Sequence, residues 1–309
     1  MKYNLNNNGN KKIKIILFSS IIYIMLYNDN IDYEIEKIMS IKGSNANSLN
    51  WVNIENDFKF LALKYKYLIK REKPIIYNSP IWIMWYQGIK YAPPIVKSCI
   101  KSVIINKGKH HLHIIDKNNL KKYLKLPSYI IEKFNNKSFS ITHLSDIVRM
   151  GLLYKYGGIW IDSTILLTTP LKKYNSSFFT LKKRQCGKHP FIKCKWVVFI
   201  MGSRKKSFIS TYVYISFLIY LKKYNSFIDY FLLDYIISIA YKYVDEFKNM
   251  IDKLPYDSCD MNLFSYLDLG YENSYFRCQF NKLSYKKHFN LLNGKNKSNY
   301  GYIIEKYKI

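Results

Sequence analysis

The stretch SITHLSDIVRMGLLYKYGGIWIDSTI, residues 140–165, decides the fold class of this chain. Its apolar residues recur at the i, i+3, i+4, i+7 and i+8 spacing of an amphipathic helix: Leu144, Ile147, Val148, Gly151 and Leu152. Gly157 and Gly158 are predicted to end that helix, as glycine does at a left-handed C-cap. The apolar run IWI (159–161) then predicts a short buried strand with Asp162 at its carboxyl end.

A strand–helix–strand unit precedes this stretch. The run IWIMW (81–85), bounded by Pro80 and Gly88, is typical of a strand buried on both faces. Pro93 and Pro94 suit the start of a helix, and an apolar stripe continues from there to residue 104. A second strand, HLHII (111–115), follows. Two strands joined by a helix within about 35 residues predict a parallel sheet and an α/β fold.

The acidic residues of this region stand where a ligand is expected. Ligands of open parallel sheets bind at the carboxyl ends of the strands, and Asp162 closes the third predicted strand. Asp146 and Arg149 fall off the apolar stripe and are expected to point away from the core. Two interpretations stay open: these side chains line a ligand crevice, or Asp146 and Arg149 form a solvated i,i+3 ion pair worth about 0.2–0.5 kcal/mol.

A further carboxylate, Asp234, lies in YFLLDYIISIAY (230–241), a helical stretch that is apolar on nearly all sides. A carboxylate in such surroundings is expected to be buried, so it needs a partner or a raised pKa. Pairing with a buried cation and a catalytic role both remain open for Asp234.

Composition limits the function classes. The chain has 309 residues, 49% of them hydrophobic, enough for a substantial core. Its formal net charge of +28 suits anionic lipid or phosphate-bearing molecules, although AT-rich coding would raise the lysine content equally well. With no nucleic-acid-binding module in the sequence, nucleic acid is not an expected partner. The 5 cysteines form no CxxC pair, and a reducing, cytoplasmic setting is the simplest interpretation.

We expect three parts along the chain: a basic and apolar segment at 1–30, a helical extension at 31–75 and the main domain at 76–309. In the first part, lysines precede the apolar run 16–27, which is a short membrane segment or interfacial anchor, a buried helix, or a secretion signal. A basic flank would leave the N-terminus on the cytoplasmic side. The expected location is cytoplasmic, peripheral or N-terminally anchored at the inner face of an anionic membrane.

Four stretches carry a resemblance to a known family: IWIMWYQGIKYAPPIVKSCIKS (81–102), HIIDKNNLKKYLKLPSYIIEKF (113–134), HLSDIVRMGLLYKYGGIWIDSTI (143–165) and IDYFLLDYIISIAYKY (228–243). Together they resemble the capsular polysaccharide synthesis proteins, relatives of glycosyltransferases that share an SDxxR…YGGxxxD block. The resemblance implies a GT-A-like fold, a single Rossmann-type α/β domain with added helices. It also implies a hexosyltransferase-like enzyme that moves a sugar from a nucleotide-sugar donor to a surface glycan or glycolipid.

The resemblance also implies residue roles. Donor-binding positions would be Gln87, Gly88, Asp146, Arg149, Gly157 and Gly158. Asp162 would be the first carboxylate of a DxD-like motif, catalytic and bearing on the ribose and a divalent cation. Asp234 would be the catalytic group on the acceptor side, where it orients or deprotonates the attacking hydroxyl.

The DxD-like motif is incomplete, because it reads Asp162–Ser163–Thr164 and the second carboxylate is a threonine. Mn²⁺ or Mg²⁺ normally keeps one or two carboxylates plus phosphate oxygens, so dependence on a divalent cation stays open. Lysine or arginine could neutralise the departing diphosphate instead, and Lys286 in KLSYKK (282–287) could reach a phosphate. Two other functions remain: a non-catalytic nucleotide-sugar-binding or membrane-surface protein, and a glycosyltransferase that acts on protein.

Overall fold

A computed structural model describes residues 31–42, 49–71, 73–76, 78–172, 176–183, 192, 194–254 and 262–309. The chain divides into two compact units, residues 1–46 and 47–309. The first contains helix α2 (Ile31–Lys42), and the predicted basic and apolar segment 1–30 lies outside the described residues. None of the helices in the described part of the chain combines the length and the apolarity needed to cross a membrane.

The second unit is built around a sheet in the order β2-β1-β3-β6-β5. Its strands are β1 (Ile81–Met84), β2 (Leu112–Ile115), β3 (Gly158–Ile161), β5 (Phe178–Phe179) and β6 (Ile200–Ser203). Strand β1 runs parallel to β2 and β3, whereas β6 is antiparallel to β3 and β5. The predicted α/β fold class with a parallel core is therefore confirmed.

Two smaller sheets accompany the main sheet. Strand β4 (Ile165–Leu167) pairs antiparallel with β7 (Phe280–Lys282), and β8 (Leu292–Asn293) pairs with β9 (Asn296–Lys297). The β4–β7 pair is important for the site because it joins the segment after Asp162 to a segment near the C-terminus.

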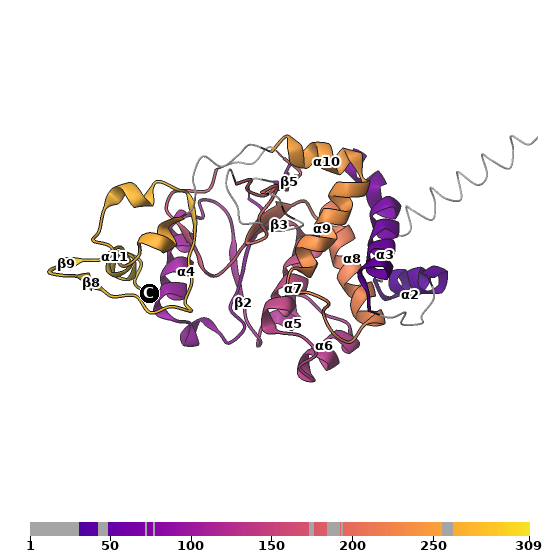
Figure 1. The fold of residues 1–309 in the computed structure, drawn as a ribbon, viewed down its shortest axis with the longest axis horizontal. Coiled ribbons are helices and arrows are strands. Elements are labelled where there is room, and N and C mark those ends of the chain that lie inside the picture. Colours follow the sequence, from indigo (N-terminus) through magenta and orange to yellow (C-terminus); the bar gives the residue numbers. More distant parts are fainter. Residues whose placement is uncertain are drawn as a thin grey trace, which may run out of the picture. The chain divides into compact units, whose positions relative to one another are not determined.

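Helices cover both faces of the main sheet (Figure 1): α7, α8 and α9 lie on one side, and α4 and α11 lie on the other. The α-helices of this unit are α3 (Trp51–Tyr65), α4 (Pro94–Asn106), α5 (Leu120–Tyr123), α6 (Ser128–Asn135), α7 (Ile141–Tyr156), α8 (Phe208–Lys223), α9 (Leu232–Tyr243), α10 (Asp245–Asp252) and α11 (Asn299–Lys306). Shorter 3-10 helices are η1 (Lys66–Arg71), η2 (Ile89–Tyr91), η3 (Asn262–Tyr266) and η4 (Asn273–Phe276).

The local signals in the sequence explain the elements around the site. Every residue of β1 and β3 is buried, as the continuous apolar runs predict. Helix α4 begins with proline at its first position, where no intrahelical N–H bond is lost. Helix α7 is capped by the Ser140 hydroxyl, which accepts from the backbone N–H of His143, and it ends at Gly157 with φ +71°.

A glycine is required where β3 begins. Gly158 has φ +104°, and a Cβ built on it would lie 2.2 Å from the carbonyl oxygen of Pro80. The Gly157–Gly158 pair therefore lets the chain reverse tightly from α7 into β3 and pack directly on the residue before β1.

Candidate functional site

The carboxyl edge of β3 brings together the three charged residues of the SDxxR…D block. The Arg149 Nη2 donates to Asp162 Oδ1 at 3.0 Å, and Arg149 Nη1 lies 3.0 Å from Asp146 Oδ1. Arg149 is only 3% exposed and Asp146 only 8%. The solvated-pair alternative was wrong, because both side chains are buried. They form a buried ion pair, because Arg149 lies against Trp160 of β3 and against Asp162, which follows that strand.

The side chain of Trp160 holds the Asp162 carboxylate in place by a hydrogen bond. Its indole Nε1 donates to Asp162 Oδ1 at 2.7 Å, and the Arg149 guanidinium carbon lies 5.1 Å from the centre of the Trp160 ring. Trp160 is 1% exposed and belongs to β3 itself. The strand therefore supplies both the carboxylate and the aromatic surface on which the arginine lies.

A residue that the sequence analysis did not single out, Lys282, completes the surroundings of Asp162. Its Nζ donates to Asp162 Oδ2 at 2.6 Å. Lys282 begins the KLSYKK segment in which Lys286 was predicted to reach a phosphate, but Lys286 is exposed and its place there stays a prediction. The register of β7 against β4 decides which of the two lysines lies near Asp162, and the sequence alone does not show that register.

The two acids of the cluster have different electrostatic environments. Burial acts to raise the pKa of Asp162, but the charges of Lys282 and Arg149, with hydrogen bonds from Lys282 and Trp160, hold that pKa below its ordinary value. Burial raises the pKa of Asp146 to about 7, opposed by the charge of Arg149 and supported by the charges of Asp162 and Asp234. These surroundings favour the ionised form of Asp162 and the protonated form of Asp146.

Asp234 lies in the first turn of α9 and is 4% exposed, as the apolar stretch around it predicts. Its Oδ1 accepts a hydrogen bond from the indole Nε1 of Trp196 at 3.0 Å. The charge of Asp234 contributes to the raised pKa of Asp146, so these two carboxylates are close enough to interact. The structure thus brings Asp234 toward the Asp146–Arg149–Asp162 cluster.

Three buried nitrogen atoms near the cluster have no hydrogen-bond acceptor among the described residues, namely Arg149 Nε, Arg149 Nη1 and Trp85 Nε1. Trp85 follows the carboxyl end of β1, next to β3, and packs edge-on against Tyr285 with ring centres 5.2 Å apart. Arg149 Nη1 lies close to Asp146 but is not aligned for a hydrogen bond. Because an unsatisfied buried donor costs about 1–3 kcal/mol, this edge is suited to anionic oxygens.

The predicted donor-binding residues divide between two edges of the sheet. Gln87 and Gly88 follow β1, at the same carboxyl edge as Asp162, where Gln87 is exposed and Gly88 has φ +91°. Gly157 and Gly158 are at the amino end of β3, so a strand of four residues, about 13 Å of extended chain, separates them from Asp162. The structure therefore does not bring this glycine pair together with the cluster.

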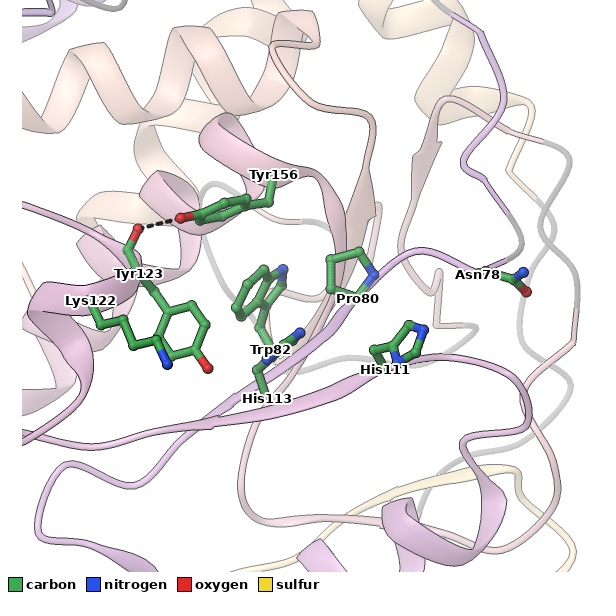
Figure 2. Close-up of a pocket in the computed structure, with 8 residues that line it drawn as sticks. All are labelled: Asn78, Pro80, Trp82, His111, His113, Lys122, Tyr123 and Tyr156. Atoms are coloured by element: carbon green, nitrogen blue, oxygen red, sulfur yellow. Dashed lines mark hydrogen bonds between the residues drawn. The ribbon is translucent and has the colours of Figure 1, made fainter.

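A separate pocket of about 460 Å³ also opens at the amino edge. It is lined by Asn78, Pro80, Trp82, His111, His113, Lys122, Tyr123 and Tyr156 (Figure 2). The Trp82 Nε1 donates to the carbonyl of Gly157 at 2.9 Å, and the Trp82 and His113 rings stack at 4.7 Å. This pocket is not the site of the charged cluster, because none of Asp146, Arg149 and Asp162 lines it.

The oxygens of Asp162 do not suit a divalent cation as they are arranged. Oδ1 accepts from Arg149 and Trp160, and Oδ2 accepts from Lys282, so two cationic groups already contact this carboxylate. Thr164 stands where a second carboxylate would be, and it is 8% exposed. In the described residues, no three His, Cys, Asp or Glu side chains gather to hold a metal ion by themselves. The predicted role of Asp162 as a metal ligand therefore finds no matching donor set.

The bonding state of the cysteines differs from the one that their number and spacing suggested. Cys194 and Cys278 are each disulfide-bonded, whereas Cys99 is a buried free thiol. The sequence analysis did not predict these disulfides, which persist mainly in oxidising compartments.

Comparison with known proteins adds an independent line of evidence. A family model described as "Capsular polysaccharide synthesis protein" matches residues 32–303. The protein called O-glycosyltransferase braB, from Annulohypoxylon truncatum, is 30% identical over 105 residues, which are 31% of this chain and 25% of that protein. The matched region spans about a quarter of the length of this curated relative. The solved structure of the PaToxG glycosyltransferase superposes with a TM-score of 0.36 and 12% identity, covering 65% of this chain and 89% of that one.

Proposed function

This chain belongs to the capsular polysaccharide synthesis protein family, and from that premise we propose that it is a glycosyltransferase. The substrate would be a nucleotide sugar, and the acceptor a hydroxyl group of a surface polysaccharide or glycolipid. The similarity to a protein called an O-glycosyltransferase supports the reaction type. The observation that carries the proposal is the convergence of Asp146, Arg149 and Asp162 at the carboxyl edge of the parallel sheet.

The charges of this cluster suit a diphosphate leaving group. Arg149 offers a buried N–H without an acceptor, and the Trp85 indole offers another. Lys282 is 37% exposed in its side chain, so its ammonium can reach a ligand. Fixed donors of this kind stabilise charge that develops in the transition state, and they do so best where water is excluded. We assign the diphosphate to this side of the cluster.

The carboxylates of the cluster and of Asp234 are suited to binding the donor sugar and activating the acceptor. Asp162, ionised and held by Trp160, would accept hydrogen bonds from hydroxyl groups of the donor. Asp146 and Asp234 are buried and close to each other, and one of them would take the proton of the attacking hydroxyl. A base whose pKa lies near the working pH performs this transfer most efficiently, and the pKa of Asp146 is about 7. Asp234 keeps its assignment to the acceptor side as a part of this proposal.

The net positive charge of the chain supports the proposed contact with a membrane surface. An excess of 28 positive charges favours an anionic surface, and a membrane surface presents the glycan or glycolipid acceptors that the family's name suggests. The disulfide-bonded Cys194 and Cys278 favour a surface that faces an oxidising compartment.

Turnover of nucleotide sugars by the purified chain tests the function. We expect release of a nucleoside diphosphate from one member of a panel of UDP- and GDP-sugars, and a loss of at least about 100-fold in kcat in the Asp162→Asn variant. The variant should keep the wild-type circular dichroism spectrum, since asparagine has nearly the same volume. Near-normal turnover by that variant would remove Asp162 from the mechanism. Binding of a nucleotide sugar without any turnover would favour the non-catalytic alternative.

A further inference from the structure

The position of Lys282 is fixed by the backbone rather than by chance contact of a long side chain. In the β4–β7 ladder, Lys282 is paired with Ile165, the first residue of β4. The backbone N–H of Leu283 continues this pairing with a bond to the carbonyl of Thr164 at 2.8 Å. Residues 162–165 form a turn closed by a bond from the N–H of Ile165 to the carbonyl of Asp162 at 2.9 Å. Lys282 therefore lies directly across from the Asp162–Ser163–Thr164 turn.

At this position the ammonium group contacts Oδ2, the Asp162 oxygen to which neither Arg149 nor Trp160 donates. Lys282 Nζ is 2.6 Å from Asp162 Oδ2, whereas Arg149 and Trp160 donate to Oδ1 from the core side. Lys282 and Asp162 are 37% and 22% exposed in their side chains, against 4% for Arg149. The second oxygen of the carboxylate, where a metal ion would bind, is thus already paired with a cation.

A divalent cation at Asp162 would meet two obstacles. It would lie beside the positive charges of Lys282 and Arg149 in a partly buried site, where repulsion is only weakly screened. It would also lack the second carboxylate, because Thr164 takes that place and a hydroxyl carries no charge. The ammonium group carries one positive charge rather than two, needs no second carboxylate and already contacts Asp162.

We propose that Lys282 supplies, at the donor diphosphate, the positive charge that a divalent cation would otherwise supply, and that transfer by this chain needs no divalent cation. This inference rests on the proposed function.

In the reaction, the bond between the sugar's C1 and the diphosphate oxygen breaks, and its electron pair stays on that oxygen. The acceptor's hydroxyl oxygen forms the new bond to C1, and the hydroxyl proton passes to a carboxylate. Lys282 keeps its proton throughout. It turns from Asp162 Oδ2 toward the diphosphate, or bridges both anions, and its partial exposure leaves room for that movement.

The first experiment compares turnover of the UDP- and GDP-sugar panel by the wild-type chain in excess EDTA and in Mn²⁺. The rates should agree within about twofold. Isothermal titration of UDP and GDP in EDTA provides a readout that does not depend on turnover, and one of them should bind. Turnover or binding that disappears in EDTA and returns with Mn²⁺ overturns this inference and leaves the proposed function standing. No turnover and no binding under either condition overturns the proposed function as well.

The second experiment replaces the lysine. Lys282→Met should lower kcat in EDTA by about 100-fold or more with a smaller change in KM, because the leaving-group charge develops mainly in the transition state. Lys282→Arg keeps the charge and should recover part of that loss. The control is Lys287→Ala, an exposed lysine of the same segment whose Nζ lies 5.5 Å from the centre of the Phe264 ring. Equal kcat in Lys282→Met and Lys287→Ala contradicts the inference, and thermal unfolding verifies that both variants are folded.

Discussion

Replacing Arg149 with methionine tests whether the buried charge cluster stabilises the fold as well as the ligand. The guanidinium lies 3.0 Å from carboxylate oxygens of both Asp146 and Asp162 and is 3% exposed. Methionine fills a similar volume without the charge. Asp162 keeps Lys282 and Trp160 as donors, but Asp146 loses the only cation with which a salt bridge of the described residues joins it.

The size of the effect follows from this asymmetry. Removing one partner of a buried ion pair costs about 3–5 kcal/mol, because an uncompensated charge remains. Asp146 can escape part of that cost by taking up a proton, since its pKa is already about 7 and rises further without Arg149. The loss in unfolding free energy should therefore approach about 3–5 kcal/mol at pH 8 and be smaller at pH 6.

The unfolding free energy of the wild-type chain should also depend on pH through Asp146, but to a smaller extent. A carboxyl group whose pKa is raised on folding contributes stability that is fully present below its unfolded pKa, about 4. For Asp146 this contribution declines as the pH rises from about 4 and is lost above about 7. The Asp146→Asn variant cannot titrate, so this component of the pH dependence should disappear from its stability profile.

Urea unfolding followed by circular dichroism at pH 6 and pH 8 measures these changes. A double-mutant cycle with Arg149→Met and Asp146→Asn should give a coupling energy of at least about 1 kcal/mol at pH 8, because the two side chains are in contact. Additive effects, or a loss below about 1 kcal/mol in Arg149→Met at pH 8, would refute the view that this pair is buried and mutually neutralised.

Two other predictions concern the turn and the surface. Gly158→Ala should destabilise the chain by more than about 1–3 kcal/mol, because φ +104° strains an alanine and its Cβ would meet the Pro80 carbonyl. Gly108→Ala is the control, with φ +58° and no atom within 4 Å of the added Cβ, and an equal loss in both variants would contradict the close approach. The chain should also sediment with vesicles that contain anionic lipid, and less so as salt is raised. Equal sedimentation with neutral vesicles would contradict an electrostatic contact.

The pattern of apolar residues and turn signals is enough to predict the parallel core. The runs at 81–85 and 159–161 are short, continuous and bounded by glycine or proline. This pattern is typical of strands buried inside a sheet. The same reasoning places Asp162 at a carboxyl edge, where it lies in the structure. These features depend on neighbours in the chain, which is why one sequence predicts them.

What the sequence could not decide is which distant residues surround Asp162. Lys282 is 120 positions further along the chain, and only the pairing of β7 with β4 brings it to the carboxylate. The burial of Arg149 is likewise a tertiary effect, because Trp160 and Asp162 lie against a side chain whose surroundings the helical pattern alone leaves open. Local spacing determines which way a side chain leaves its own element, whereas the packing of other elements determines whether it meets water, a partner or a ligand there.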